Sequence, residues 1–559
     1  MIGIQFGPAE HGPITASLDR LRADRYVSRL WEHDGALWGD DPKIQATARE
    51  RLGWLTLPED GLAQADDLAA FAQELRRDGL QHALVLGMGG SSLAPEVLRE
   101  TFGVAPSFLS LDVLDSTHPD VVLALDRKLD PRRTLYIVAS KSGTTTEPLA
   151  FMEHFWQKAG GTGRQFVAIT DPGTPLERLA HERGFRRVFR HPPDVGGRYA
   201  ALTPIGLVPA ACIGLDLRRL LGSAKEAADA CRKDGADNPG LVLGAAIGAY
   251  AAQGRDKVTL VTDQAIATFG LWVEQLVAES TGKFGRGILP VEREPLGPPS
   301  VYGSDRLFVQ MRTRAGGPDD AALDALEEAG HPVLRIDLAD PYDLGALFFT
   351  WEFAVPVAST FITVEPFDQP NVQESKDNTV RLLKHYTESG ELPRDKPALT
   401  EHGVSLTPLG AAAGALDGAK NLHDALRAYL DQVRPGDYVA ITAYVPSLPE
   451  TERELQAIRK TLRDRLHVAT TIGFGPRFLH STGQLHKGGA NTGVFIQITN
   501  EPGDDAPVPG QPYGFATLVA AQAQGDVEAL QAHGRRALRI DLGKDVAGGL
   551  RKIAEAVRE

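Results

Sequence analysis

Short apolar runs that alternate with helical patterns constrain the fold of this chain more than any other feature. Each run is bounded by glycine or polar residues and is followed by a segment with helical spacing. Such alternation is typical of a parallel sheet covered by helices, so we expect an α/β fold. The predicted strands are His82–Leu86, Ser107–Val113, Leu135–Ala139 and Gln165–Ile169 in one sheet, and Lys257–Val261, Leu307–Met311, Val333–Ile336 and Phe361–Val364 in a second.

The length of 559 residues allows about three or four domains. A glycine- and proline-bearing stretch near 235–240 and a polar, proline-bearing stretch over 388–408 are the predicted breaks between them. The expected units are an N-terminal helical segment at 1–60, α/β domains at 61–234 and 240–395, and a third α/β unit at 410–559.

Three segments of the last unit echo segments of the second unit in the same order. Shared order favours internal duplication, although strands of similar composition also match by chance. The paired segments are Asp256–Leu260 with Asp437–Ile441, Leu307–Gln310 with Val494–Gln497, and Leu334–Leu338 with Leu538–Leu542.

A loop rich in hydroxyl groups follows the predicted strand Leu135–Ala139. Residues 140–147 read Ser-Lys-Ser-Gly-Thr-Thr-Thr-Glu and precede a predicted helix. In α/β folds this loop lies at the carboxyl edge of the sheet, where ligands bind. Backbone N–H groups at a helix start, with hydroxyl donors beside them, suit a phosphate group. A helix cap needs only one such residue, so the loop predicts a phosphate site.

A glycine-rich loop, Gly87–Ser92, follows the first predicted strand. It fails as a dinucleotide motif because the third glycine position falls on Ser92, and the chain has no Gly-Lys-Ser/Thr nucleotide loop. Its glycines let a ligand approach the backbone, and Ser91 supplies a hydroxyl, although a tight turn explains the same residues. If the strands before this loop and residues 140–147 are neighbours, the two loops form one pocket.

Three further segments place charged groups near predicted loops. Arg198, in Val-Gly-Gly-Arg-Tyr, offers an anion ligand whose charge does not depend on pH. Gln275 and Glu279 share one face near the end of a predicted helix, where the helix dipole disfavours a charged carboxylate and so suits a general base. Lys376 lies in the first turns of another helix. Taken singly, each is equally explained as a solvated surface residue.

The composition limits the partners. Lys and Arg number 59 against 73 Asp and Glu, a net charge of −14, which argues against nucleic acid or an anionic membrane as the main partner. Cys212 and Cys231 form neither a disulfide framework nor a metal-binding pattern, which fits a reducing cytoplasm. The first twenty residues are polar and do not resemble a signal peptide.

Together these segments resemble the phosphoglucose isomerase family. Residues 140–147 are similar to its phosphate loop, and Gly89-Gly90-Ser91 to its first sugar-binding loop. Val195–Tyr199 matches its Val-Gly-Gly-Arg-Tyr/Phe signature, Glu279–Lys283 its Glu-Ser-Asn-Gly-Lys stretch, and Phe367–Lys376 its late Asp-Gln to Lys segment. The layout is most similar to the isomerase half of bacterial transaldolase–isomerase fusions. The implied fold is a tandem of sugar isomerase (SIS) domains, three-layer αβα units with mainly parallel sheets.

The resemblance implies interconversion of glucose 6-phosphate and fructose 6-phosphate through a cis-enediol(ate), in glycolysis and gluconeogenesis, without a metal or organic cofactor. Glu279 would move the proton between C1 and C2, Arg198 would stabilise the developing negative charge, and Lys376 would assist ring opening. The implied sugar-phosphate ligands are Gly90, Ser91, Ser140, Lys141, Ser142, Thr145, Gly197 and Gln275.

The ring-opening histidine of the family is missing from the corresponding stretch, Tyr302–Arg306. The later segment Gly483–Gly489 contains His486, which we expect to supply this group by folding back or from a second subunit. His480 and Lys487 add to the polarity of that segment, and a loop histidine in a diverged repeat is the alternative. The resemblance also implies a homodimer with shared sites.

Two other functions stay open. The chain could isomerise another sugar phosphate, such as mannose 6-phosphate, or it could bind sugar phosphates without turnover. Glu279, Arg198 and Lys376 weigh against a binding protein, which would need only the phosphate loops. We expect a phosphorylated hexose substrate, no nucleic acid or membrane partner, and a cytoplasmic location; association with a separate transaldolase is left open.

Overall fold

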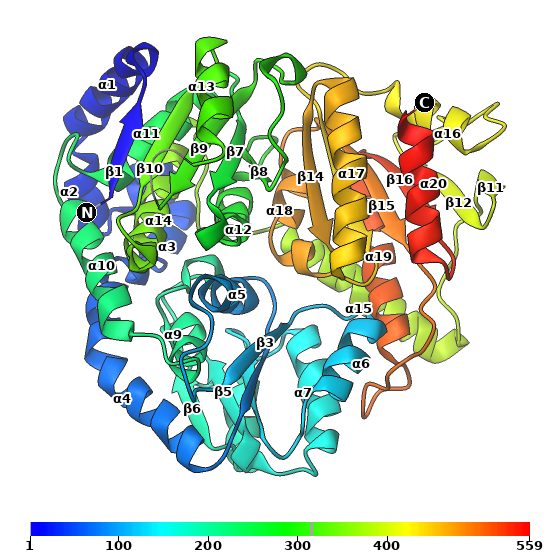
Figure 1. Cartoon of the computed structure of the whole chain (residues 1–559), viewed down its shortest axis with the longest axis horizontal. Coiled ribbons are helices and arrows are strands. Elements are labelled where there is room, and N and C mark those ends of the chain that lie inside the picture. The colour runs from blue at the N-terminus through cyan, green and yellow to red at the C-terminus, as the bar shows by residue number, and fades with distance from the viewer. Residues whose placement is uncertain (1, 314–316, 559) are drawn as a thin grey trace.

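The computed structural model describes residues 2–313 and 317–558, and its core is three β-sheets flanked by helices (Figure 1). The first sheet has the order β3-β2-β4-β5-β6, with all neighbours parallel. This confirms the α/β prediction; we call this sheet and its helices the first unit. Its elements are β2 (His82–Leu86), α5 (Gly90–Phe102), β3 (Ser110–Leu114), α6 (Pro119–Lys128), β4 (Thr134–Ala139), α7 (Thr146–Lys158), β5 (Phe166–Thr170), α8 (Pro175–Glu182), β6 (Arg187–Arg190), α9 (Pro204–Cys212) and α10 (Leu217–Ala230).

The second unit has the sheet order β1-β10-β9-β7-β8, in which β1 is an antiparallel edge strand. Because β1 comes from the N-terminus, the predicted helical segment 1–60 is not wholly helical. The elements are β1 (Gly3–Phe6), α11 (Pro239–Ala252), β7 (Lys257–Thr262), α12 (Phe269–Thr281), β8 (Leu289–Glu292), β9 (Arg306–Arg312), α13 (Asp320–Glu328), β10 (Val333–Asp337) and α14 (Leu344–Phe361).

The third unit repeats this strand order. Its strands β12-β16-β15-β13-β14 correspond in position to β1-β10-β9-β7-β8, with β11 added at the edge. The three sequence echoes fall on equivalent strand pairs, which supports the predicted duplication. The elements are β11 (Leu399–Glu401), β12 (Val404–Gly410), α16 (Leu422–Leu430), β13 (Tyr438–Tyr444), α17 (Pro449–Leu466), β14 (Ala469–Phe474), α18 (Gly483–Gly488), β15 (Gly493–Thr499), α19 (Phe515–Ala532), β16 (Arg536–Asp541) and α20 (Val546–Arg558).

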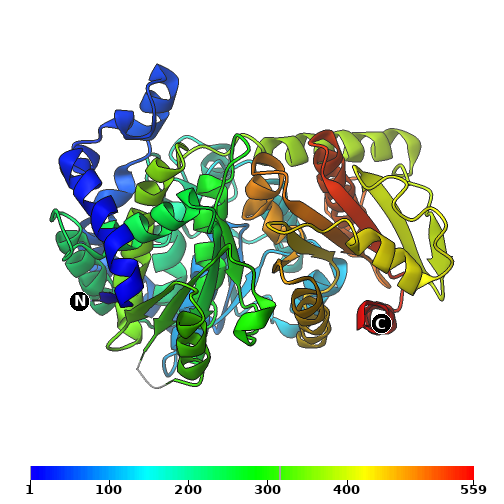
Figure 2. The same ribbon diagram turned by 90° about the horizontal axis from the view of Figure 1, so that it is seen from above.

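The remaining helices connect or cover these units. Seen from above, the N-terminal helices lie on the outer side of the second unit, at the opposite end of the molecule from the third unit (Figure 2). Helix α15 leads from the second unit into the third and packs against α19. The bounds are α1 (Pro8–Ala23), α2 (Tyr26–Trp31), α3 (Pro42–Arg49), α4 (Leu57–Arg77) and α15 (Val372–Ser389).

Two predictions about local structure were wrong. The run Phe361–Val364 is not a strand, because it forms the end of α14 and the turn after it. A short apolar run cannot be told from the end of a buried helix by periodicity alone. Stretch 388–408 is not only a linker, because it contains β11 and most of β12, and β12 pairs with β16 in the third sheet.

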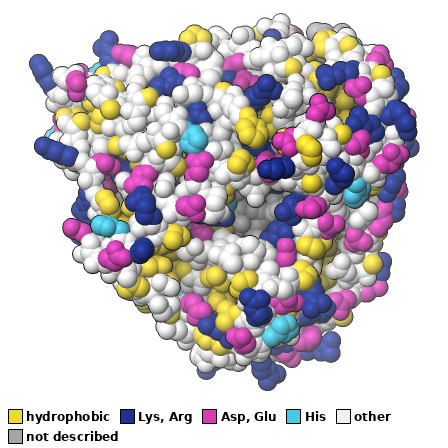
Figure 3. Space-filling view, turned by 180° about the vertical axis from the view of Figure 1, so that it is seen from behind, with side chains coloured by type: hydrophobic (Ala, Val, Ile, Leu, Met, Phe, Trp, Pro, Cys, Tyr) yellow, Lys and Arg dark blue, Asp and Glu magenta, His cyan; other side chains and the backbone are white. Residues whose placement is uncertain are grey.

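Helix α14 is the most apolar long helix that the structure describes. The segment Pro341–Phe361 is long and apolar enough to cross a membrane, but 89% of its apolar window is buried inside the protein. It packs against α10, α11 and α12, so it forms the core of the second unit. On the face shown in Figure 3, acidic and basic side chains are interspersed rather than gathered into a basic patch.

The second and third units meet at their outer strands, β8 and β14. Glu294, just after β8, bridges them: its Oε1 accepts from the backbone N–H of Thr470 at 2.9 Å, and its Oε2 lies 2.8 Å from Arg306 Nη2. Arg459 of α17 donates to the backbone oxygen of Glu292 at 2.8 Å. These charged groups are all buried. The interface therefore has a specific, hydrogen-bonded geometry.

Candidate active site

The two predicted ligand loops lie side by side. Strands β2 and β4 are parallel neighbours, so the loops after them open at the same edge of the first sheet. Gly90, the first residue of α5, touches the backbone of Gly197 so closely that a Cβ would have no room. This contact brings the Val-Gly-Gly-Arg-Tyr loop to the glycine-rich loop. The glycines therefore permit the close approach of two backbones.

The hydroxyl-rich loop presents its side chains at the start of α7. Ser140 Oγ donates to Thr145 Oγ1 at 3.0 Å, and the hydroxyls of Ser142 and Thr144 lie 3.0 Å apart. Thr145 precedes the helix, yet its side chain makes no capping bond. Gly143 adopts a φ of +65°, which lets the loop turn. Hydroxyls and the N-terminus of α7 thus form an anion-binding arrangement.

Lys141 is held away from this loop by an ion pair. Its Nζ contacts Asp171 Oδ2 and the backbone oxygen of Pro193. Asp171 also lies 2.9 Å from Nδ1 of the buried His191. Burial by itself would raise the pKa of Asp171, but His191 and Lys141 outweigh it and lower that pKa. Lys141 is thus a partner of Asp171, and its remaining means of holding a phosphate is its backbone.

Arg198 and Glu279 form the charged centre of the site. Arg198 Nη1 lies 3.2 Å from Glu279 Oε1, and both side chains are nearly buried. The guanidinium also donates to Ser280 Oγ at 2.8 Å and to the backbone oxygen of Pro366 at 2.6 Å. Gln369 Oε1 accepts from Nη1 at 2.9 Å. Arg198 is therefore fixed by several acceptors while still facing the carboxylate.

Aromatic side chains support Arg198 from behind. Trp54, which precedes α4, stacks on Tyr199 with ring centroids 5.4 Å apart, and Phe367 packs on Tyr199 at 5.5 Å. The buried Lys283 binds the backbone oxygen of Asp368 at 2.8 Å, beside the segment that accepts from Arg198. The N-terminal segment and both units thus fix the position of this arginine.

A glutamine of α12 links the centre to the third unit. Gln275 Nε2 donates to Glu279 Oε2 at 2.9 Å and to the backbone oxygen of His480 at 2.7 Å. Gly89, with a φ of +56°, lies against His480 and the end of Gln275, where a Cβ would clash. His480 therefore lies among residues of the first and second units.

His480 pairs with a buried carboxylate that we did not predict. Its Nε2 lies 3.1 Å from Oε1 of Glu147, in the first turn of α7. Burial alone would raise the pKa of Glu147, but His480 and, to a smaller extent, Lys376 outweigh it and lower that pKa. An ionised carboxylate only accepts, so Nε2 carries the proton and Nδ1 is the acceptor nitrogen. In the sequence, Glu147 was visible only as the last residue of the hydroxyl-rich loop.

His486, the predicted ring-opening group, lies elsewhere. Its ring is buried among Tyr438, Phe478 and Phe495, with the Phe495 centroid 5.1 Å away. Burial holds the pKa of His486 well below its usual range, with the charges of Lys487 and Arg535 adding to the effect. It packs inside the third unit, whereas His480 of the same segment reaches the site. Lys376 is exposed on α15, near enough for its charge to act on Glu147.

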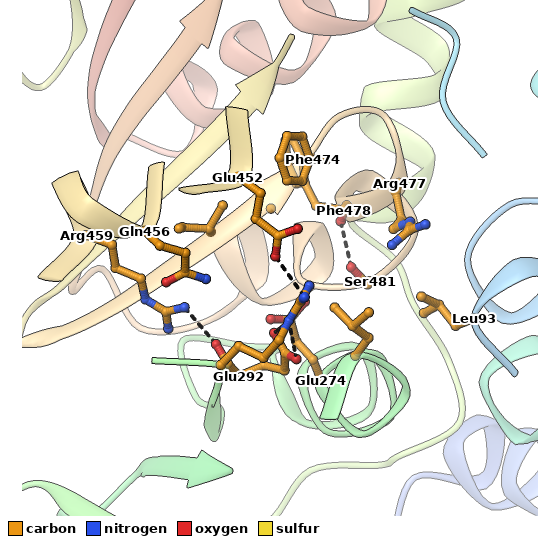
Figure 4. Close-up of a pocket in the computed structure, with 14 residues that line it drawn as sticks. Leu93, Glu274, Glu292, Glu452, Gln456, Arg459, Phe474, Arg477, Phe478 and Ser481 are labelled. Carbon is orange, nitrogen blue, oxygen red and sulfur yellow. Dashed lines mark hydrogen bonds and ion pairs between the residues drawn. The ribbon is translucent and has the colours of Figure 1, made fainter. Parts of the chain in front are cut away.

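A separate cavity of about 40 Å³ lies between α12, β8, α17 and β14 (Figure 4). Glu274, Glu292 and Arg459 line it, and burial together with the charge of Glu292 raises the pKa of Glu274 to about 8. A cavity of this size has room for water molecules but not for a hexose phosphate. The sugar site is therefore at the loops described above and not here.

Comparison with known proteins agrees with this geometry. The phosphoglucose isomerase family model matches residues 74–286, which span the first unit and α12. The glucose-6-phosphate isomerase of Prochlorococcus marinus is 30% identical over 406 residues, covering 65% of this chain and 77% of that protein. That of Symbiobacterium thermophilum is 31% identical over 396 residues, covering 59% of this chain and 86% of that protein.

Solved structures share the fold. A hypothetical protein of Thermus thermophilus has a TM-score of 0.58 at 26% identity and covers 68% of this chain and 99% of its own. A glucose-6-phosphate isomerase of Chlamydia trachomatis has a TM-score of 0.54 at 18% identity, over 67% of this chain and 86% of its own. With the sequence relatives and the shared loops, these findings lead to one conclusion: the chain belongs to the phosphoglucose isomerase family.

Proposed function

We propose that this chain interconverts glucose 6-phosphate and fructose 6-phosphate by ring opening and proton transfer through a cis-enediol(ate). The observation that carries the proposal is the pairing of Glu279 with Arg198 at 3.2 Å, within one site that also holds the hydroxyl-rich loop. A carboxylate base beside a fixed cation is what an enediolate intermediate needs. The curated relatives carry the name of this activity.

The phosphate end of the substrate is held by the first unit. Ser140, Ser142 and Thr145 donate hydroxyl hydrogen bonds, and the N-terminus of α7 adds backbone donors. Lys141 contributes its backbone, because its side chain is paired with Asp171. The other proposed binding residues stay as predicted; they are Gly90, Ser91, Gly197 and Gln275.

Ring opening is assigned to His480 in place of His486. With Nε2–H donated to Glu147, His480 Nδ1 accepts the proton of the C1 hydroxyl. Lys376, on the exposed rim near Glu147, supplies a proton to the ring oxygen. Both groups belong to segments that approach the first unit at the far end from the phosphate loop.

Proton transfer follows in the open chain. Glu279 removes the proton from C2 of the aldose and returns it to C1, so the electron pair moves from the C–H bond into the enediolate. Arg198 stabilises the negative oxygen, and its fixed acceptors mean that it does not reorganise during the step. Gln275 holds Glu279 in place and binds sugar hydroxyls.

A coupled assay with fructose 6-phosphate tests the proposal. Pure, folded protein should form glucose 6-phosphate, and absence of turnover would refute the function. Turnover on mannose 6-phosphate at a higher kcat/KM would instead select the alternative substrate. Tight sugar-phosphate binding without turnover would select the binding protein, which Glu279, Arg198 and Lys376 speak against.

The remaining expectations form part of the proposal. The four-part division at 1–60, 61–234, 240–395 and 410–559 is kept, with β11 and β12 joined to the third unit. A homodimer and an association with a transaldolase stay predictions, as does a cytoplasmic location. Because His480 comes from the same chain as Glu279, the proposed chemistry needs no residue from a second copy.

A further inference from the structure

Helix α19 of the third unit presents a buried polar face toward the candidate site. Gln522 and Asp526 lie one turn apart on this face, and both side chains are almost fully buried. Buried polar groups cost stability unless they are hydrogen-bonded, so their placement calls for a specific role. Neither residue belongs to the segments that gave the family resemblance.

Gln522 occupies the middle of a chain of hydrogen bonds. Thr117 Oγ1 donates to Gln522 Oε1 at 2.6 Å, which fixes the orientation of the amide. Gln522 Nε2 therefore faces Glu147 and donates to its Oε1 at 2.7 Å. The same oxygen faces His480 Nε2 at 3.1 Å. One carboxylate oxygen thus receives one hydrogen bond from the third unit's helix and one from the histidine.

The same helix holds the two segments that carry His480 and Lys376. Asp526 Oδ1 forms a buried ion pair with Nζ of Lys487, in α18, at 2.8 Å. At Gly525, where the backbone lies close to Thr379, α15 approaches α19, and Asn378 Nδ2 donates to the Gly525 backbone oxygen at 3.1 Å. Helix α19 therefore fixes the α18 segment, α15 and the Glu147 carboxylate relative to one another.

We propose that Gln522 is a positioning residue for ring opening: it keeps Glu147 ionised and aimed at His480. A hydrogen bond donated to a buried carboxylate stabilises its charged form. The charged form accepts from His480 Nε2–H and so keeps Nδ1 as the acceptor nitrogen. Gln522 acts through Glu147 and does not touch the sugar. This inference rests on the proposed isomerase function.

The test compares Gln522→Leu and Thr117→Val with wild-type protein in both reaction directions. Each variant removes one hydrogen bond of the chain, and Gln522→Leu removes the bond to Glu147 itself. We expect kcat to fall roughly tenfold for Gln522→Leu and less for Thr117→Val, with KM for fructose 6-phosphate nearly unchanged. The acid limb of the kcat–pH profile should move to higher pH by roughly one unit, because Glu147 then protonates more easily.

Two matched variants serve as controls. Thr117→Ser keeps the hydroxyl and should restore the wild-type profile that Thr117→Val loses. Gln531→Leu removes the amide of a half-buried glutamine nine residues further along α19 and should leave kcat and the profile unchanged. If Gln522→Leu fails to fold, the Thr117 pair still decides, because its side chains are nearly equal in volume.

The outcomes separate this inference from the proposed function. An inactive wild-type protein would refute the isomerase function and this role with it. An active wild type whose Gln522→Leu and Thr117→Val variants keep both kcat and the acid limb would refute the positioning role alone. A loss of kcat without any shift of the acid limb would also overturn it, because a general loss of packing lowers activity without changing the protonation of Glu147.

Discussion

Arg198 Nη1 lies 3.2 Å from Glu279 Oε1, and this ion pair joins a loop of the first unit to helix α12 of the second. Ser280 and the backbone of Pro366 and Asp368 hold the other guanidinium nitrogens. The charge that stabilises an enediolate is thus in place before the substrate binds. A cation with fewer donors could not keep all of these contacts.

Replacing Arg198 by lysine should lower kcat by a factor on the order of 10²–10³ with a small change in KM. A single ammonium group cannot donate to Ser280, Pro366 and Gln369 and still face Glu279. Steady-state kinetics with fructose 6-phosphate measure the effect. The exposed Arg218→Lys is the control, and equal activity of the two variants would refute the assigned role of Arg198.

The two histidines of the third unit should respond in opposite ways. His480→Gln removes the group that pairs with Glu147 and should lower kcat by a factor on the order of 10²–10⁴. His486→Phe places an apolar ring among Tyr438, Phe478 and Phe495 and should leave kcat almost unchanged. Parallel kinetics of both variants are the measurement. The reverse pattern would show that His486 opens the ring.

The bridge between the second and third units should dominate the stability of their interface. Glu294→Leu leaves the buried Arg306 without its carboxylate, and we expect a loss of about 3 kcal/mol of stability. Thermal unfolding in comparison with the exposed Glu388→Ala measures it. Equal unfolding midpoints for the two variants would mean that Glu294 does not hold the units together.

Glu274 should make stability depend on pH. Burial and Glu292 raise its pKa in the folded chain from 4.5 to about 8, so the folded state binds more protons between these values. The contribution of Glu274 to stability therefore falls as the pH rises from 4.5 to 8. Glu274→Gln removes this term, so its unfolding midpoint should gain on wild type over that range. A difference that is independent of pH would contradict the raised pKa.

The sequence predicts most strands of the first two sheets because each is a short apolar run bounded by glycine or polar residues. It also predicts Arg198 and Glu279 together, since both lie in distinctive segments. It could not choose between His480 and His486, because their segment is polar throughout and only the packing of the third unit shows which ring is buried. Phe361–Val364 was wrong for a related reason: apolar character does not distinguish a helix end from a strand. Glu147 acquires its partners from chain segments more than three hundred residues away.

Hydrogen exchange during turnover tests the central claim most directly. In heavy water with fructose 6-phosphate, wild-type protein should form glucose 6-phosphate that carries deuterium at C2, observed by proton NMR. Glu279→Gln should retain binding of inorganic phosphate while exchange and turnover fall at least about a thousandfold, on the order expected for loss of a general base. Deuterium incorporation at the wild-type rate in Glu279→Gln would contradict the account.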